Sequence, residues 1–439
     1  MIPNIEKASK AEIKAFQEGQ LKLLLSYLNK HSVFYKRMFK KHNIDINNII
    51  TLEDLTKIPT TSKDDLQQYN DDFICVPKKE IIDYTTTSGT LVEPITIILT
   101  ENDLNVLAYN EAISFACAGI NKNDIVQLST TIDKQFMAGL AYFLGARKIG
   151  CGIIRTGAGS PELQWNSILK YSPTYLITVP SFLLKLIEYA NKNNIDLNNC
   201  SIKNAICIGE SIRNEKFSEN ELSKKIKSNW NIKLFSTYAS TEMRAAFTEC
   251  EHNKGGHHHP ELLIIEVLDD DDNPVKNGCP GELTITTIAV EGMPLLRFKT
   301  GDIIKTHSTK CKCGRNTFRL SPVIGRKNHM IKLKGTSIYP DMIYNVLNKF
   351  DEIHDYILEL NSIVGSDQII IKILPDNPSK KLSDKIILSL KANIKVSPII
   401  KFIDNEKLKK LQFPKLSRKK RKLIDNRNKK IILDYEYKE

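Results

Sequence analysis

The spacing of apolar residues changes along the chain and predicts regions of different structure. Over residues 12–42 the apolar positions recur at helical spacing, and residues 60–66 have the N-cap pattern that opens another helix. From about residue 81, short β-branched runs alternate with helical stretches. This alternation predicts strands at 94–99, 124–130, 150–156, 174–179 and 204–209, with helices at 102–119, 138–149 and 181–193.

The pattern shifts again in the last part of the chain. Two apolar runs within residues 261–288 flank a turn rich in Asp, Asn, Pro and Gly, which predicts a β-hairpin-rich segment. Beyond residue 335 a helix and two strands follow one another. The expected fold class is therefore α/β. We expect a large N-terminal domain (1–326) of layered, mixed or parallel sheets with helices, and a small, mobile α+β domain (327–439).

The composition is that of a globular protein, with 41% hydrophobic and 26% charged residues. No run of 18 apolar residues occurs, and the first residues lack an apolar signal core. We therefore expect neither a membrane-spanning nor a secreted protein. Nine widely spread cysteines do not make a disulfide framework, and they favour a cytoplasmic location with at most one metal site.

The net charge of +12 is distributed unevenly. Residues 401–439 contain 14 Lys and Arg against 6 Asp and Glu, so they carry +8 of this charge. A uniformly basic surface for nucleic acid is therefore not supported, and the basic C-terminal tail needs its own explanation.

The first segment whose side chains could bind a ligand is residues 83–94, just before a predicted strand. Four consecutive Thr and Ser hydroxyls, a glycine and another Thr form a loop of donors suited to phosphate oxygens. Taken alone, the segment reads equally as a polar surface loop. It lacks the Gly-Lys-Ser/Thr ending of a Walker loop, which disfavours a P-loop NTPase.

Two later segments add an aromatic ring and carboxylates. Tyr238 to Glu242 follows an apolar run, and this order suits base stacking, phosphate binding and Mg²⁺ coordination. In the segment Phe298 to Asp302, an Asp after a tight turn suits a ribose diol. Each segment alone reads as an ordinary strand end or turn.

Taken in order, these segments resemble the adenylate-forming superfamily and, within it, the phenylacetate–CoA ligase family. The resemblance runs from about residue 15 to about residue 430. It includes TTSKDDL (60–66), TTTSGTLVEP (85–94), CIGESI (207–212), YASTE (238–242), FKTGD (298–302), GRKNHMIKLKGTSIYP (325–340) and KKRKLIDNR (419–427).

The resemblance implies ATP and Mg²⁺ as ligands. The loop after residue 86 would grip the β- and γ-phosphates, Tyr238 would stack on adenine, and Asp302 with Arg326 would hold the ribose hydroxyls. The implied nucleotide-binding residues are Thr87, Ser88, Gly89, Thr90, Gly209, Glu210, Tyr238, Ala239, Ser240, Asp302 and Arg326.

The resemblance also implies a catalytic set. Thr241 would contact the α-phosphate, Glu242 would hold Mg²⁺, and Lys419 would bridge the carboxylate and the α-phosphate. A carboxylate attacking a phosphate brings two anions together, so shielding by cations is the central requirement. The small domain would deliver Lys419 for adenylation and turn away for thioester formation, with a hinge near Lys327 and Asn328.

Several positions depart from the family's pattern. Val92 and Glu93 stand where a glycine and a lysine are usual in the phosphate loop, and a glutamate aimed at triphosphate would repel it. Arg418 replaces the usual glycine before the catalytic lysine, and Lys420 is an adjacent alternative to Lys419. We therefore expect a divergent subgroup of the family.

Two cysteine-containing segments predict a metal site. Cys250 and His257 lie before the hairpin region, while Cys311 and Cys313 lie after it. Three thiolates and one imidazole make a closed tetrahedral Zn²⁺ site with a structural role. The alternative histidines are His252, His258 and His259, and the alternative reading is two loops with unpaired cysteines.

The resemblance implies an aryl or arylacetic acid as the substrate and CoA as the acceptor. The expected pocket residues are Gln135, Phe136, Gly139 and Ser236. Three other readings stay open: loading of a carrier protein or another nucleophile, a catalytically weak nucleotide-binding homologue, and a polyanion-binding protein using residues 407–430. A homodimer is also left open, and neither a nucleic acid nor a membrane is expected as a partner.

Overall fold

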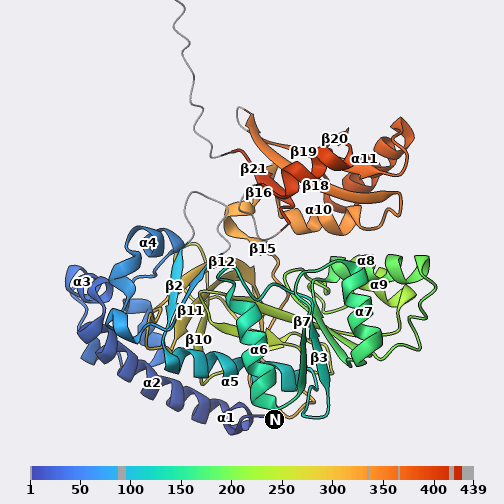
Figure 1. The fold of residues 1–439 in the computed structure, drawn as a ribbon. Coiled ribbons are helices and arrows are strands. Elements are labelled where there is room, and N and C mark those ends of the chain that lie inside the picture. Colours follow the sequence, from blue (N-terminus) through green and yellow to red (C-terminus); the bar gives the residue numbers. More distant parts are fainter. Residues whose placement is uncertain (1, 88–94, 334–335, 364–365, 415–419, 428–439) are drawn as a thin grey trace, which may run out of the picture. The chain divides into compact units, whose positions relative to one another are not determined.

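The computed structural model describes residues 2–87, 95–333, 336–363, 366–414 and 420–427. It divides into two compact units, Met1–Ile324 and Gly325–Glu439 (Figure 1). Each unit combines sheets and helices. The expected layered α/β class is confirmed. Among the helices that the structure describes, none is long and apolar enough to span a bilayer.

Helices dominate the N-terminal part of the first unit, as the apolar spacing predicts. Ser9 forms a capping box with Glu12, which fixes the start of the long helix α2. The buried leucines of α2, Leu21, Leu24, Leu25 and Leu28, recur at helical spacing. The helical elements of this part are α1 (Asn4–Lys7), α2 (Lys10–His31), α3 (Val33–Lys41), η1 (Ile46–Asn48), η2 (Leu52–Lys57), α4 (Lys63–Gln68), η3 (Asn70–Phe73) and η4 (Lys78–Glu80).

A six-stranded sheet forms the centre of the first unit, in the order β4-β3-β5-β6-β7-β8. Its strands are β3 (Ile125–Leu128), β4 (Gly152–Arg155), β5 (Tyr175–Thr178), β6 (Asn204–Cys207), β7 (Lys233–Ser240) and β8 (Ala245–Thr248). All pairs are parallel except the β7–β8 hairpin. The accompanying helices are α5 (Glu101–Cys117), α6 (Met137–Ile149), α7 (Pro161–Tyr171), α8 (Pro180–Lys192) and α9 (Glu221–Asn229).

The predicted hairpin over 261–288 is confirmed, because β10 (Leu263–Leu268) pairs antiparallel with β11 (Gly281–Thr287). β11 in turn pairs with β12 (Phe298–Ile304). One expected strand, at 94–99, does not join the parallel sheet: β2 (Thr96–Leu99) pairs antiparallel with β1 (Asp83–Thr86). A small sheet of β13 (Thr306–His307), β14 (Arg319–Leu320) and β9 (Gly256–His257) completes the first unit.

The second unit has its own apolar core. Its four-stranded sheet has the order β20-β19-β18-β21, and α10 and α11 contribute buried residues such as Ile343 and Ile386. The elements are β15 (Gly325–Arg326), η5 (Lys327–His329), β16 (Ile331–Leu333), β17 (Thr336–Ile338), α10 (Pro340–Leu347), β18 (Ile353–Ile363), β19 (Ser366–Pro375), α11 (Lys380–Ile394), β20 (Ile399–Phe402), α12 (Asn405–Gln412) and β21 (Leu423–Asp425).

Candidate active site

The segment with Thr241 and Glu242 is the turn of the β7–β8 hairpin. Tyr238 pairs with Phe247 in this hairpin, and residues 241–244 connect the two strands. Thr241 is half-buried and Glu242 is buried. Because the turn follows the carboxyl end of β7, these side chains lie at the sheet edge where α/β proteins usually bind ligands.

Asp302 is brought to the same place by an irregularity in the neighbouring sheet. Between paired positions of β11 and β12, residues 300–302 stand opposite the single residue Leu283. Gly301 has φ +80°, a left-handed conformation that favours glycine, and it allows this bulge. The Tyr238 hydroxyl donates a hydrogen bond to Asp302 Oδ2 at 2.7 Å. The predicted adenine-binding ring and the predicted ribose-binding carboxylate are therefore in direct contact.

Gly209 and Glu210 follow β6, the strand next to β7. Parallel pairing of β6 and β7 places these residues at the same sheet edge as the hairpin turn. Gly209 has φ +73°. Glu210 Oε2 accepts a hydrogen bond at 2.9 Å from the backbone N–H of Ser181, in the first turn of α8. Glu210 thus also stabilises the N-terminus of α8.

The predicted phosphate loop begins and ends at the β1–β2 hairpin. The Thr87 N–H donates to the Ile95 carbonyl at 3.0 Å and closes the loop at its base, and Thr87 itself is buried. Ser88, Gly89, Thr90, Val92 and Glu93 lie outside the described residues.

The expected acid pocket begins beside this loop. The Gln135 carbonyl accepts a hydrogen bond from the Thr86 N–H at 3.1 Å, and half-buried Phe136 is the N-cap residue of α6. At Gly139 a Cβ atom would lie 2.0 Å from the Thr131 carbonyl oxygen, so close packing of α6 against this backbone requires glycine. Ser236, on β7, lines a small cavity together with Tyr238.

Two predicted residues belong to the second unit. Arg326 ends β15, and Lys419 lies outside the described residues. The neighbouring Lys420 is described, and its Nζ lies 2.5 Å from Asp355 Oδ2, on β18 of the same unit.

Glu242 is paired with a lysine. Lys63 Nζ, at the start of α4, lies 3.2 Å from Glu242 Oε1. Burial raises the pKa of Glu242, but the Lys63 ammonium and nearby hydrogen bonds outweigh this effect and hold the pKa below its usual value. The carboxylate is therefore ionised, as a ligand of Mg²⁺ must be.

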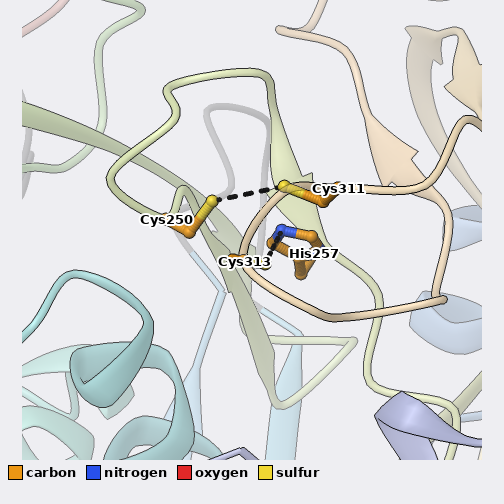
Figure 2. A group of neighbouring side chains, drawn as sticks. All are labelled: Cys250, His257, Cys311 and Cys313. Atoms are coloured by element: carbon orange, nitrogen blue, oxygen red, sulfur yellow. Dashed lines mark hydrogen bonds between the residues drawn. The ribbon is translucent and has the colours of Figure 1, made fainter.

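The four predicted metal ligands meet in space (Figure 2). The ligand atoms of Cys250, His257, Cys311 and Cys313 all lie within 4.8 Å of one another. Cys250 Sγ is 3.6 Å from Cys311 Sγ, and Cys313 Sγ is 3.4 Å from His257 Nε2. Tetrahedral ligands at about 2.0–2.3 Å from one Zn²⁺ ion stand roughly 3.3–3.8 Å apart, so both distances fit this geometry.

The residues around this cluster favour a thiolate at Cys313, and they identify His257 as the histidine of the cluster. Hydrogen bonds from Cys250 and then from His257 and Arg315 lower the pKa of the Cys313 thiol. His257 Nδ1 lies 3.4 Å from Thr317 Oγ1, which leaves Nε2 facing Cys313. The other histidines have other partners: Glu251 lies near His252, the Leu263 carbonyl contacts His258, and Glu6 contacts His259.

The N-terminus reaches the same cluster. Glu6, in α1, is fully buried, and its Oε2 accepts a hydrogen bond from Arg315 Nε at 2.5 Å. Arg315 Nη1 in turn lies 3.6 Å from Cys313 Sγ. The backbone N–H of Asn316 donates to the Glu6 carbonyl at 2.7 Å. The first helix is therefore fastened to the cysteine-containing loop.

Comparison with known proteins gives these features a context. Residues 31–291 match the AMP-binding enzyme family. The chain is 30% identical to a phenylacetate-coenzyme A ligase of Thermus thermophilus, over 80% of this chain and 78% of the relative. The chain belongs to the phenylacetate–CoA ligase family of AMP-binding enzymes. A phenylacetate-coenzyme A ligase of Escherichia coli is 27% identical over 84% of each chain.

Solved structures share the fold of this chain. A 2-hydroxyisobutyryl-CoA ligase in complex with its adenylate, in the postadenylation state, superposes with a TM-score of 0.84 at 22% identity. The superposition covers 97% of this chain and 92% of that chain. The sequence relatives confirm the expected membership of the phenylacetate–CoA ligase family. The solved structures show that this chain has the same fold as they do.

Sequence reasoning missed the partners of several predicted residues. Lys63 stands in the quoted segment TTSKDDL but was assigned no role, although it contacts Glu242. Arg315 follows Cys313 by two positions, and Glu6 lies at the other end of the chain. Lys63 stands at a helix start and Arg315 stands near a cysteine. In the sequence alone, neither residue can be distinguished from an ordinary charged residue of the surface.

Proposed function

We propose that this protein activates a carboxylic acid with ATP to an acyl-adenylate and then transfers the acyl group to CoA, releasing AMP and pyrophosphate. The observation that supports this proposal is the contact between Tyr238 and Asp302 beside the ionised Glu242, in a chain of the phenylacetate–CoA ligase family. An aromatic ring, a diol-binding carboxylate and a metal-binding carboxylate are what an adenosine polyphosphate requires.

In the first half-reaction the acid's oxygen attacks the α-phosphorus and pyrophosphate leaves. Thr241 would donate to an α-phosphate oxygen, while Asp302 accepts from the ribose hydroxyls and orients the nucleotide. Glu242 would hold Mg²⁺, and the ion would supply positive charge where the two anions meet. The acidity and burial of Glu242 fit this role. In the second half-reaction the CoA thiol attacks the carbonyl carbon and AMP leaves.

Lys419 is proposed as the second cation of adenylation. Lys420 is already paired with Asp355, which favours Lys419 as the lysine that reaches the phosphate. Arg326 is proposed to assist Asp302 at the ribose. The division of the chain into two units is compatible with a second unit that delivers Lys419 for one half-reaction only.

The acid is proposed to be aryl or arylacetic. The curated relatives named above are phenylacetate-coenzyme A ligases, and the acid class is transferred from them. Phe136 is the residue proposed to contact the substrate ring, because it lies beside the base of the phosphate loop through the Gln135–Thr86 hydrogen bond. Gly139 stays a proposed pocket residue, and its packing against the Thr131 carbonyl independently requires glycine.

A structural Zn²⁺ ion is proposed at Cys250, His257, Cys311 and Cys313. The ligand separations support it. Three thiolates with one Zn²⁺ ion leave one negative charge, which the buried Arg315 offsets beside Cys313. With four protein ligands no position stays open, so the ion would stabilise the fold rather than react.

The test of this function is a panel of aryl, arylacetic and short-chain acids with ATP and Mg²⁺. Pyrophosphate release is measured with and without CoA for each acid. We expect CoA to accelerate turnover with at least one aryl or arylacetic acid and to be consumed as the thioester. Pyrophosphate release without any thioester would instead indicate a carrier protein or another acceptor. No release with any acid would contradict the proposal.

A further inference from the structure

The carboxylate proposed to hold Mg²⁺ already has a cation beside it. Lys63 Nζ lies 3.2 Å from Glu242 Oε1, and the two residues come from distant parts of the first unit. Their environments differ: the side chain of Glu242 is only 5% exposed, whereas that of Lys63 is 48% exposed. The carboxylate is thus fixed in the interior, and the lysine reaches it from the surface.

The position of Lys63 is fixed by the strand that carries Asp302. The Thr61 N–H donates to the Arg297 carbonyl at 2.9 Å, and the Lys299 N–H donates to the Thr61 carbonyl at 2.8 Å. Ser62 then forms a capping box with Asp65 and starts α4, so that Lys63 is the first helical residue. Its backbone is therefore anchored beside β12, while its long side chain is about half exposed.

The turn that carries Glu242 is anchored independently. Arg244 is buried, with φ +53°, and its Nη1 lies 3.3 Å from Asp103 Oδ2. Arg244 Nη2 also donates to the Met293 carbonyl at 3.2 Å. Asp103 accepts from the backbone N–H groups of Glu291 and Gly292 at 3.0 and 3.1 Å. The hairpin turn is thus held by a buried arginine, and Glu242 does not depend on Lys63 for its position.

We propose that Lys63 is an exchangeable counter-ion of Glu242. It neutralises the buried carboxylate when no nucleotide is bound, and Mg²⁺ displaces its ammonium when Mg²⁺–ATP enters. The inference rests on the proposed function, because it concerns the same metal ligand. Lys63 therefore acts on the metal site through Glu242 and is not itself a catalytic residue.

The exchange follows from the chemistry of the two cations. A buried carboxylate without a nearby cation is costly, and the Lys63 ammonium, 3.2 Å from Glu242, offsets this charge while no metal is bound. Lysine is a compact charge on a flexible stem, and the side chain of Lys63 is about half exposed, so its ammonium can return to water when a divalent ion takes its place. The site then carries positive charge before and after nucleotide binding.

The experiment compares Lys63→Met with the wild type by thermal denaturation at fixed ATP and increasing free Mg²⁺. Removal of the competing ammonium should lower the half-saturating Mg²⁺ concentration by on the order of two- to fivefold, the range expected for one partly exposed ion pair. Without ligands, Lys63→Met should melt at a lower temperature than the wild type. Lys63→Arg should restore much of this loss.

Two further variants make the result specific. Lys57→Met removes an exposed lysine whose partner is Asp54 at 2.7 Å, and it should leave the Mg²⁺ dependence unchanged. In a Glu242→Gln background, Lys63→Met should no longer affect the ligand-free melting temperature, because no carboxylate remains to be paired.

The outcomes separate this inference from the function on which it rests. A wild type that shows no ATP-induced shift at any Mg²⁺ concentration would overturn both the proposed function and the exchange. An ATP-induced shift with equal or higher half-saturating Mg²⁺ in Lys63→Met would overturn the exchange alone. The latter result would mean that Lys63 is indifferent to the metal or helps to bind it.

Discussion

The Tyr238 hydroxyl donates a hydrogen bond to Asp302 at 2.7 Å, and this contact joins two separate sheets of the first unit. Tyr238 comes from β7 in the central six-stranded sheet, while Asp302 comes from a bulge in β12. The contact fixes the carboxylate next to the aromatic ring. Nucleotide binding in our account therefore depends on a junction between sheets rather than on one contiguous motif.

Replacement of Tyr238 by Phe tests this junction. The ring remains for stacking, but Asp302 loses a donor, which costs about 1 kcal/mol for one hydrogen bond. We expect the KM for ATP to rise by roughly fivefold, corresponding to that energy, with little change in kcat. Steady-state kinetics at saturating acid and CoA measure this split. An unchanged KM would show that Asp302 is oriented without the tyrosine hydroxyl.

The role of Lys419 is tested by separating the two half-reactions. Lys419→Ala should slow adenylation by on the order of 10²-fold or more, because a cation is removed from between two anions. Thioester formation from preformed acyl-adenylate should stay largely intact. A merely destabilising substitution would depress both half-reactions.

Lys420→Ala is the matched control for Lys419. Its ammonium is paired with Asp355, so its removal should affect stability more than adenylation. If Lys420→Ala abolishes adenylation and Lys419→Ala does not, Lys420 is the catalytic lysine. If neither substitution affects adenylation, the two-conformation mechanism is wrong for this chain.

The zinc proposal predicts about one zinc ion per chain and a lower melting temperature for Cys311→Ser, with loss of the metal.

The zinc proposal also predicts a role for the N-terminus. Glu6→Gln weakens the hold on Arg315, and zinc release to a chelator should accelerate by on the order of tenfold, as for other residues that support metal ligands. Elemental analysis and chelator-release rates measure these effects.

Glu12→Gln is a suitable control for Glu6→Gln. It removes a nearby exposed carboxylate that only caps α2, so it should leave zinc release unchanged. A metal-free protein whose stability is unaffected by Cys311→Ser would end the zinc proposal.

A buried carboxyl group away from the site predicts a pH dependence of stability. Burial raises the pKa of Glu111, in α5, to about 8. In the unfolded chain this group titrates near its usual value of 4.5, so between 4.5 and 8 the folded state binds more protons than the unfolded state. Stability contributed by the neutral carboxyl is therefore lost as the pH rises through this window.

Glu111→Gln should remove that loss. We expect the variant to melt at a higher temperature than the wild type above pH 8, and the difference should shrink toward pH 4.5. Melting curves across this range measure the effect. A difference that does not depend on pH would show that Glu111 is not a proton-binding group of the folded state.

Much of the fold follows from local patterns in the sequence. The β-branched runs at 124–130, 174–179 and 204–209 became adjacent parallel strands, because buried parallel strands require continuous apolar runs. The run at 94–99 is also rich in β-branched apolar residues, yet its strand β2 pairs antiparallel with β1. Apolar periodicity indicates that a segment is a strand, but it does not specify the pairing partner.

The candidate site was predictable to the same extent. Tyr238, Glu242 and Asp302 stand in recognisable segments, whereas their contacts with one another and with Lys63 arise only from tertiary packing. The bond between Glu6 and Arg315 joins residues 309 positions apart, so spacing cannot reveal it. Gly139, an expected pocket residue, also has a packing role that spacing did not reveal, because a Cβ there would lie 2.0 Å from the Thr131 carbonyl oxygen.

The most direct test of the central claim follows one oxygen atom through the reaction. An accepted aryl or arylacetic acid labelled with ¹⁸O in both carboxylate oxygens is incubated with the protein, ATP, Mg²⁺ and CoA, and the products are analysed by mass spectrometry. Attack of the carboxylate on the α-phosphorus predicts one ¹⁸O atom in AMP, one in the thioester carbonyl and none in pyrophosphate. Unlabelled AMP, or label in pyrophosphate or phosphate, would contradict an acyl-adenylate intermediate and with it the proposed function.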